Sequence, residues 1–312
     1  MEPDPVRPIR YGMVIDVDRC TGCGSCMVAC AVENNIPAAD PSATDRTGLT
    51  WMKVYRAAPA KPAAVTGPVA DLAAARAPAV VGPVADRASA GGGRAGSISE
   101  RGSREVFFPV PCQHCDHETP CESVCPQLAV ELDPQTGIVT QIPSRCLGCR
   151  YCMAACPYHA RYFNWWDPVQ PEGLDGSLNP DVSPRMRGVV EKCNFCHGRL
   201  QAARSLAALE GRKTLRSGDY VPACAEACPA QAISFGDLRD ETSEVARSAK
   251  DPRAFRLLER LGTDPKVYYH SSRPWVRALG QSVFERSSAP LEFVDAGAPP
   301  PSEPLSQEAG RA

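Results

Sequence analysis

One stretch of twelve residues, 146–157, constrains the structure of this chain more than any other. It places cysteines at the spacing C-x2-C-x2-C-x3-C and follows the last of them with proline. These cysteines are Cys146, Cys149, Cys152 and Cys156. Thiolates at this spacing hold iron–sulfur clusters, and the fourth cysteine of such a run ligates a second cluster. Gly148 lets the loop bend closely around the first cluster. One run therefore requires a partner elsewhere in the chain.

The chain supplies three further cysteine motifs, and the four motifs together use all 16 cysteines. Motif I has the spacing of the central run, which is motif III. Motif II has a wider middle gap, C-x2-C-x5-C-x3-C, and motif IV is split into two pairs by a long excursion. The cysteines of these three motifs are Cys20, Cys23, Cys26 and Cys30 (I), Cys112, Cys115, Cys121 and Cys125 (II), and Cys193, Cys196, Cys224 and Cys228 (IV).

The order of the motifs predicts which cysteines share a cluster. Motifs II and III lie close in sequence around a predicted hairpin, so we expect them to pair, with motifs I and IV pairing around them. When the last cysteine of each motif crosses to the partner motif, every thiolate is used once, and four thiolates per cluster indicate [4Fe–4S]. The predicted ligands are Cys20, Cys23, Cys26 and Cys228 for cluster 1, Cys193, Cys196, Cys224 and Cys30 for cluster 2, Cys112, Cys115, Cys121 and Cys156 for cluster 3, and Cys146, Cys149, Cys152 and Cys125 for cluster 4.

Zinc and disulfides are the alternative uses for so many cysteines. Two C-x2-C pairs also make a zinc site, so a zinc-binding structural module is a remote alternative. Zinc does not require a third cysteine two residues on and a fourth directed elsewhere. Disulfides are disfavoured because C-x2-C pairs close only with strain.

Several polar residues lie beside the motifs without being needed as ligands. Because the thiolate count is complete, we expect the histidines to lie around the clusters or on the surface. The arginines have two open interpretations, namely hydrogen bonding toward cluster sulfur and ordinary solvation. These residues are His114, His117, His159 and His197, and Arg145, Arg150 and Arg161.

The segments between the motifs predict an α+β fold. It consists of two interleaved bacterial-ferredoxin-like 2[4Fe–4S] units, made of short β-hairpins and short helices with long loops and a disordered insertion. We expect strands at 11–19, 51–55 and 106–110, a hairpin of 128–132 and 137–142, an amphipathic helix at 198–209 with Leu200, Ala203 and Ala207 on one face, and a surface helix with Asp251 as N-cap and Pro252 at its first position.

Composition divides the chain into segments. Residues 57–104 are rich in Ala, Gly and Pro and lack aromatic residues, so we expect a disordered insertion that cannot bury enough apolar area to order itself. The predicted organisation is an outer unit (10–56 plus 190–240), the insertion (57–104), an inner unit (105–166), a loop (167–189), a C-terminal helix and docking segment (241–286) and a disordered tail (287–312).

Charge and hydropathy exclude two kinds of binding. A net charge of −2 and an isoelectric point of about 6.2 provide no basic field for nucleic acid. No run of about 18 or more apolar residues is present, so we expect no direct membrane span. The N-terminus has no basic-then-apolar signal and no twin arginine, so we expect no signal peptide of its own.

The motifs and the sequences around them resemble the four-cluster iron–sulfur (beta) subunits of molybdopterin oxidoreductases, the dimethyl sulfoxide, polysulfide and tetrathionate reductase type. An insertion at 57–104 and an extra residue between Cys115 and Cys121 look like departures from the family pattern. The resembling segments are Tyr11–Cys20, Pro111–Cys115, Cys156–Tyr158, Arg161–Trp165, Glu191–Cys196, Pro222–Pro229, Phe235–Leu238 and Gly262–Tyr269.

This resemblance implies a non-catalytic electron-transfer subunit. Its partners would be a catalytic subunit with molybdenum or tungsten bound to molybdopterin and a membrane-anchor subunit that reacts with quinone. The chain would be peripheral to the membrane through these partners, on the cytoplasmic side or, by co-export with a partner, on the periplasmic side.

One alternative is the equivalent subunit of a membrane-bound nickel hydrogenase, which would carry the same motifs. An enzyme in its own right is disfavoured, because the chain has no Gly-rich nucleotide loop and no C-x3-C-x2-C radical motif. The terminal substrate, the direction of electron flow and the cluster potentials are not encoded in these motifs.

Overall fold

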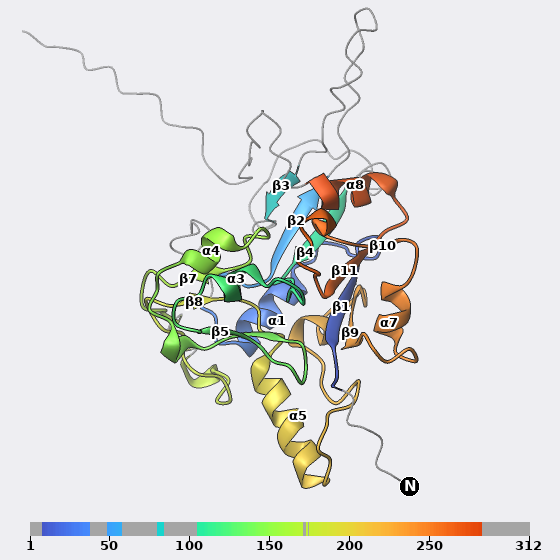
Figure 1. Cartoon of the computed structure of the whole chain (residues 1–312). Coiled ribbons are helices and arrows are strands. Elements are labelled where there is room, and N and C mark those ends of the chain that lie inside the picture. The colour runs from blue at the N-terminus through green and yellow to red at the C-terminus, as the bar shows by residue number, and fades with distance from the viewer. Residues whose placement is uncertain are drawn as a thin grey trace, which may run out of the picture.

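The computed structural model describes residues 8–37, 49–57, 80–83, 105–170, 173 and 175–282 (Figure 1). Short helices and short strands alternate along these ranges, which confirms the α+β class. None of the helices in the described ranges has the length and apolar character that a membrane crossing requires. The predicted disordered tail, 287–312, and most of the predicted insertion lie outside the described residues.

A four-stranded sheet joins the two ends of the described chain, in the order β10-β11-β1-β9. β1 is parallel to β11 and antiparallel to β9, and its side chains are almost entirely buried. β1 ends at Asp16, earlier than predicted, because the Asp16 carboxylate accepts the backbone N–H groups of Asp18 and Arg19 and bends the chain toward Cys20. The strands are β1 (Tyr11–Asp16), β9 (Ile233–Asp237), β10 (Ala254–Arg256) and β11 (Val267–His270).

A three-stranded antiparallel sheet follows motif I, in the order β3-β2-β4. Its strands are β2 (Lys53–Ala57), β3 (Val80–Pro83) and β4 (Val106–Val110). β2 begins two residues later than predicted, since its pairing with β4 runs from Lys53 opposite Val110 to Ala57 opposite Val106. β3 lies within the segment predicted to be a disordered insertion, so that prediction was wrong for residues 80–83. Pairing with β2 supplies backbone hydrogen bonds that this composition did not indicate.

The segment from motif II to motif IV contains two small antiparallel two-stranded sheets, of which β5–β6 is a hairpin, and several single-turn helices. The predicted hairpin forms with shorter strands, and Gly137 in its turn has a positive φ of 72°. The elements are α3 (Pro120–Ser123), β5 (Val130–Leu132), β6 (Val139–Gln141), η1 (Pro143–Arg145), α4 (Tyr151–Ala155), β7 (Tyr162–Phe163), η2 (Asp175–Ser177) and β8 (Val190–Glu191). Strands β7 and β8 pair with each other.

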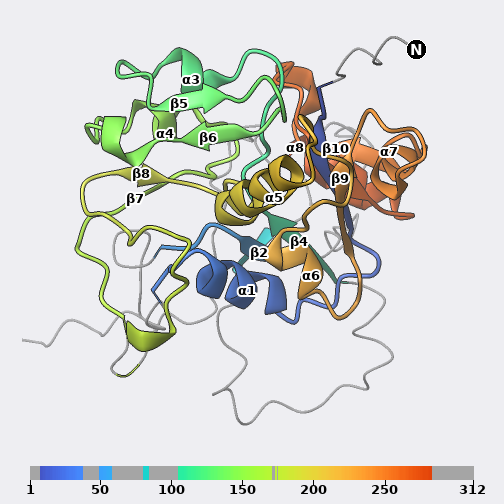
Figure 2. The same cartoon turned by 90° about the horizontal axis from the view of Figure 1, so that it is seen from below.

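Three helices carry or follow the outer cysteines: α1 (Ser25–Glu33), α5 (His197–Leu209) and α6 (Ala223–Glu226). α5 projects from the body of the molecule, and Figure 2 views the molecule from that side. Its buried residues are Leu200, Ala203 and Ala207, which confirms the predicted apolar face. Arg204 on α5 contacts Asp133 in the turn of the β5–β6 hairpin at 2.5 Å and ties the helix to that hairpin.

The predicted surface helix starting at Asp251 was wrong. The helix in this region is α7 (Glu244–Ala249), and its N-cap is Ser243, whose hydroxyl accepts the backbone N–H of Ala246 at 3.1 Å. Asp251 instead forms a turn in which its carboxylate accepts the N–H of Arg253 at 2.8 Å. The chain after this turn forms β10 and not a helix, because Phe255 is buried in the sheet. Beyond it lie η3 (Glu259–Leu261) and α8 (Pro274–Ser282).

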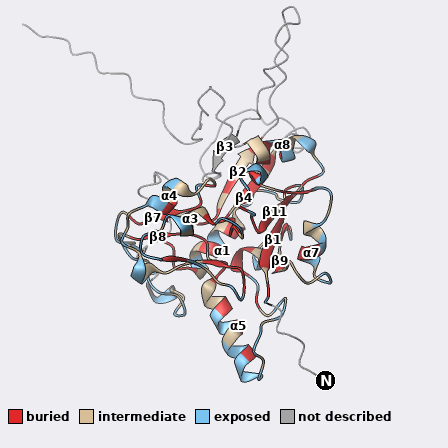
Figure 3. Ribbon diagram, in the orientation of Figure 1, coloured by how far each residue is buried: buried red, intermediate tan, exposed pale blue. Residues whose placement is uncertain are grey.

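The buried residues, whose ribbon is red in Figure 3, form one main core and one small satellite core. The main core surrounds β1 and includes cysteines from three of the motifs. Tyr11 stacks on Phe235 at 5.1 Å between ring centroids and meets Tyr220 edge-on at 5.0 Å. The satellite core is made by Cys121, Val130, Val139, Cys152 and Val190. Cysteines are therefore part of the packing that holds the elements together.

Candidate metal centres

The first set of sulfurs surrounds a hollow between the turn after β1 and the chain after α6. Cys20, Cys23 and Cys26 line it from motif I, and Cys228 lines it from motif IV. The loop enters α1 through Gly24, whose φ of 77° is the left-handed conformation that glycine adopts without strain. The structure therefore brings the predicted ligands of cluster 1 together at the surface.

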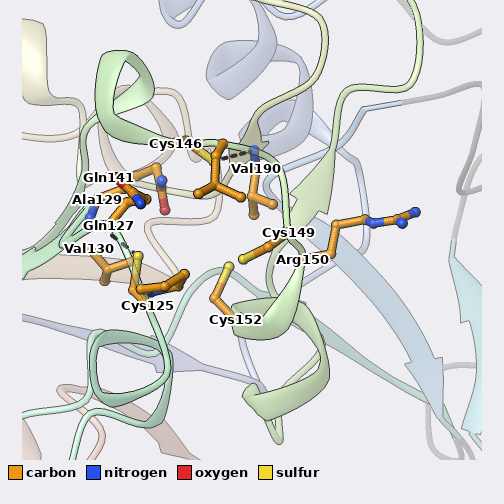
Figure 4. Close-up of a pocket in the computed structure, with 12 residues that line it drawn as sticks. Cys125, Gln127, Ala129, Val130, Gln141, Cys146, Cys149, Arg150, Cys152 and Val190 are labelled. Atoms are coloured by element: carbon orange, nitrogen blue, oxygen red, sulfur yellow. Dashed lines mark hydrogen bonds between the residues drawn. The ribbon is translucent and has the colours of Figure 1, made fainter.

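A second surface hollow gathers the predicted ligands of cluster 4 (Figure 4). Cys146, Cys149 and Cys152 line it from motif III, and Cys125 lines it from motif II. The four sulfur atoms face a common space. Gly148 has a φ of 77°, and a Cβ at this position would lie 2.4 Å from the carbonyl oxygen of the 188 backbone, so glycine is required by both strain and space.

The other two sets are more deeply buried. Cys30 ends motif I inside α1. After burial, the groups that raise its pKa most are Cys193, Cys196 and Cys224, the three cysteines with which it was predicted to share a cluster. The predicted ligands of cluster 3 also lie together. After burial, the pKa of Cys115 is raised by Cys112, Cys121 and Cys156. Burial and the nearby Cys112 raise the pKa of Cys156 to about 11.

Neighbouring sets influence one another electrostatically in a fixed order. Cys26 of the first set raises the pKa of Cys30 and of Cys224, which belong to the second set. Cys112 of the third set raises the pKa of Cys193. Across the other boundary, Cys121 raises the pKa of Cys152. The sulfurs thus form a row of four sets in which the two end sets open to the surface and the two middle sets are buried.

Burial sets the protonation state of these thiols. It raises the pKa of Cys26 to about 12 and of Cys196 to about 11, and the pKa of Cys30 is raised well above its usual range. The nearby thiols add to the shifts of Cys26 and Cys30, because bringing several thiolates together without cations is unfavourable. Iron supplies the positive charge that stabilises grouped thiolates. All sixteen cysteines are free thiols gathered in sets of four, and this donor chemistry fits [4Fe–4S] clusters.

Backbone N–H groups point at several of the sulfurs. A hydrogen bond to a thiolate favours its charged form and is common around cluster sulfur. The donors, with their distances to Sγ, are Ala129 to Cys125 (3.2 Å), Val190 to Cys146 (3.5 Å), Ala223 to Cys196 (3.4 Å) and Ala232 to Cys228 (3.3 Å). The first two are drawn in Figure 4.

The four histidines beside the motifs lie where the sequence predicted. His117 and His159 are exposed, and His197 begins α5 at a half-buried position. His114 is fully buried, accepts the backbone N–H of Val139 at 3.2 Å through Nδ1 and stacks on Phe195 at 3.7 Å between ring centroids. Burial and nearby cations hold the pKa of His114 well below its usual range, so it is a neutral packing residue.

The arginines differ from one another in a way that the sequence left open. Arg145 donates to the carbonyl of Leu128 at 3.4 Å, and Arg150 points away from the sulfurs of its hollow toward Trp165, 4.7 Å from the ring centroid (Figure 4). Arg161, by contrast, is buried.

Sequence reasoning missed Lys192. Its side chain is 1% exposed and donates to the carbonyls of Val139 and Cys193, joining β6 to motif IV. Its place in the sequence gave only one signal, a charged residue between the buried end of a strand and a cysteine.

Comparisons with known proteins agree with this geometry. Residues 104–170 match a family model described as a 4Fe-4S dicluster domain, and residues 11–32 match one described as a 4Fe-4S binding domain. The first range holds motif II and motif III, and the second holds motif I. The chain is thus a ferredoxin-type protein that carries [4Fe–4S] clusters, and its sixteen cysteines match the ligand requirement of four clusters.

Full-length relatives define the family. The chain is 48% identical over 280 residues, covering 89% of this chain and 94% of the relative, to the menaquinone reductase iron-sulfur cluster-binding subunit of Nitratidesulfovibrio vulgaris. It is 36% identical, covering 90% and 88%, to a putative dimethyl sulfoxide reductase iron-sulfur subunit of Halobacterium salinarum. It is 30% identical, covering 85% and 73%, to a selenate reductase subunit of Mesobacillus selenatarsenatis. The chain belongs to the family of iron–sulfur electron-transfer subunits of molybdopterin oxidoreductases, and it is a non-catalytic subunit of an oxidoreductase complex.

Proposed function

We propose that this chain relays electrons between a membrane subunit that reacts with quinone and a catalytic subunit that holds molybdenum or tungsten on molybdopterin. The row of four sulfur sets carries this proposal. A relay needs a cluster near the surface at each end, where electrons enter and leave, and buried clusters between them that pass electrons on. With all sixteen thiols used as ligands, no coordination position is left for a substrate.

The names of the relatives suggest the partners. The relative from N. vulgaris is a subunit of a menaquinone reductase, and those from H. salinarum and M. selenatarsenatis are subunits of reductases for dimethyl sulfoxide and selenate. We therefore propose menaquinone as the quinone. The association with the membrane would be peripheral and made through the partner subunits, on either side of the membrane.

The proposed ligand allocation crosses between motifs. Clusters 1 and 4 would be held by the sets that line the two hollows, and clusters 2 and 3 by the two buried sets. The sheet contact between β1 and β9 supports an outer unit made from 10–56 and 190–240, interleaved with an inner unit at 105–166 that surrounds the β5–β6 hairpin. The segment 241–286 adds β10, β11 and α8 to the outer sheet region.

The experiment that tests the function is a metal analysis of the native complex. The tagged chain is purified anaerobically from membranes of its host, and the metals in every co-purifying subunit are measured. We expect about 16 iron atoms per chain, with molybdenum or tungsten in a large partner. Nickel in the large partner would replace the proposed catalytic subunit with a hydrogenase, and zinc with little iron would overturn the electron-relay role.

The allocation has its own test in single cysteine variants. Cys228→Ala and Cys20→Ala should abolish the same paramagnetic resonance signal, because both residues are proposed to ligate cluster 1. Cys224→Ala should abolish a different signal, and each variant should retain about 12 iron atoms per chain. If Cys228→Ala removes the signal that Cys224→Ala removes, motif IV keeps its own cysteines and the crossed allocation is wrong.

A further inference from the structure

Arg161 is a buried cation without an ordinary counterion. Arg161 lies just before β7 and is 3% exposed. No carboxylate in the described part of the chain forms an ion pair with it, although carboxylates pair with many other arginines of the molecule. Burying a guanidinium without an anion is strongly unfavourable, so the folded protein must provide negative charge of another kind at this place.

The hydrogen bonds of Arg161 are also incomplete. Its Nη1 donates to Oε1 of Gln141 at 2.7 Å. Its Nε and Nη2 are buried and donate no hydrogen bond to any described residue. Gln141 itself lines the hollow formed by Cys125, Cys146, Cys149 and Cys152 (Figure 4). The guanidinium is thus anchored at one nitrogen, while the N–H groups of Nε and Nη2 remain available to an acceptor that the described residues do not supply.

Sulfur provides the missing negative charge. The thiols that act most strongly on the Arg161 charge are those of Cys121, Cys152 and Cys112, and the acceptor of its Nη1, Gln141, lines the hollow of the fourth set. Cys121 and Cys112 belong to the buried third set, and Cys152 belongs to the fourth set at the surface. Arg161 also acts to lower the pKa of Cys125, another member of the fourth set. The arginine therefore lies at the boundary between two sets.

We propose that Arg161 is a shared counterion of clusters 3 and 4 that donates Nε–H and Nη2–H toward their sulfur and raises the reduction potential of both. This proposal rests on the relay function and on the crossed ligand allocation proposed above. Arg161 takes part in no bond-making or bond-breaking step, since each cluster only gains or loses one electron.

The sign of the effect follows from the charge of the clusters. A [4Fe–4S] core with four thiolates bears a net charge of about −2 when oxidised and about −3 when reduced. A fixed cation stabilises the more negative state more strongly, and in a buried site this interaction is only weakly screened. Hydrogen bonds to sulfur act in the same direction, and they are among the factors that set cluster potentials. Arg161 therefore makes clusters 3 and 4 better electron acceptors than they would be without it.

The test is a potentiometric titration, followed by paramagnetic resonance, of the purified native complex carrying Arg161→Met or Arg161→Lys. The signals of clusters 3 and 4 are assigned beforehand from the cysteine variants. We expect Arg161→Met to lower the midpoint potentials of clusters 3 and 4 and to leave the potentials of clusters 1 and 2 unchanged. Arg161→Lys keeps the charge but lacks the fork of donors, so its shifts should be smaller.

Arg150→Met is the matched control, because Arg150 lies in motif III, close in sequence to Arg161, but points away from the sulfurs. It should leave all four potentials unchanged. If Arg161→Met fails to assemble clusters 3 and 4, Gln141→Leu is titrated instead. This variant removes only the acceptor of Nη1 and should shift the same two potentials.

Unchanged potentials in the Arg161 and Gln141 variants, with full iron content, would overturn the proposal while leaving the relay function intact. Equal shifts of all four clusters would also overturn it, since a general loosening of the fold would then be the cause. A wild-type complex with little iron would instead remove the proposed function itself.

Discussion

Gly148→Ala is expected to damage cluster 4 selectively, because two separate penalties meet at this glycine. Its φ of 77° costs a residue with a side chain about 1–2 kcal/mol. The new Cβ would also lie 2.4 Å from the carbonyl oxygen of Gly188, where real contacts are essentially never below 3.0 Å, so the two backbones must separate by at least 0.6 Å (3.0 − 2.4). Such overpacking typically costs about 1–3 kcal/mol, which brings the total to about 2–5 kcal/mol.

Gly24→Ala is a matched control for this variant. Gly24 has the same φ of 77°, but a Cβ there meets no atom within 4 Å. Motif III has Arg150 at the corresponding place, with a φ of 64°, so a side chain is accepted in this conformation. Gly24→Ala should therefore cost only the backbone penalty, about 1–2 kcal/mol.

The assay compares the two variants by heating them anaerobically and following cluster absorbance, together with iron content and paramagnetic resonance. The difference of about 1–3 kcal/mol corresponds to a midpoint roughly 2–12 °C lower for Gly148→Ala than for Gly24→Ala. The cluster 4 signal should be the first to disappear in Gly148→Ala. Equal behaviour of the two variants would refute the argument, because it would show that the close approach to the 188 carbonyl has no energetic consequence.

Two further predictions concern α5, whose attachment holds motif IV in place. Leu200→Ala should destabilise the protein by about 2–5 kcal/mol, because this side chain is 1% exposed, whereas Leu209→Ala, at a position 85% exposed, should change the melting midpoint little. Arg204→Met should cost about 0.5–1.5 kcal/mol, because it removes the partly buried ion pair with Asp133, and the loss should shrink in high salt. Lys250→Met breaks an exposed pair and should leave the midpoint unchanged in both salt conditions.

The sequence by itself determined the features that depend on neighbouring residues. The spacing within motif III fixes three sulfurs on one tight loop, and the same holds for motif I, whatever the rest of the chain does. β1, the β5–β6 hairpin and α5 are also local, since each is marked by its own periodicity or turn residues. The sequence also predicts a pairing of motif II with motif III and of motif I with motif IV, in which every thiol is used once.

The tertiary structure decided the features that depend on distant contacts. Asp251 and Pro252 have the sequence of a helix start, but they form a turn because Phe255 is taken into a sheet with β11. Residues 80–83 have the composition of a disordered segment, but they pair with β2. In both places a strand from elsewhere in the chain supplies hydrogen bonds and burial that override the local preference.

The same division separates the ligands from the residues around them. The spacing of the cysteines predicts their role as ligands, since a cluster needs thiolates and few other residue types can replace them. Arg161 and Lys192 do not, because a charged residue in a sequence is equally compatible with solvent and with a buried site. Only the folded chain brings the Arg161 guanidinium near sulfurs contributed by motif II and motif III, where Gln141 accepts its Nη1 hydrogen bond. The energy of a charge depends on its surroundings, and those surroundings are assembled from parts of the chain that are far apart in sequence.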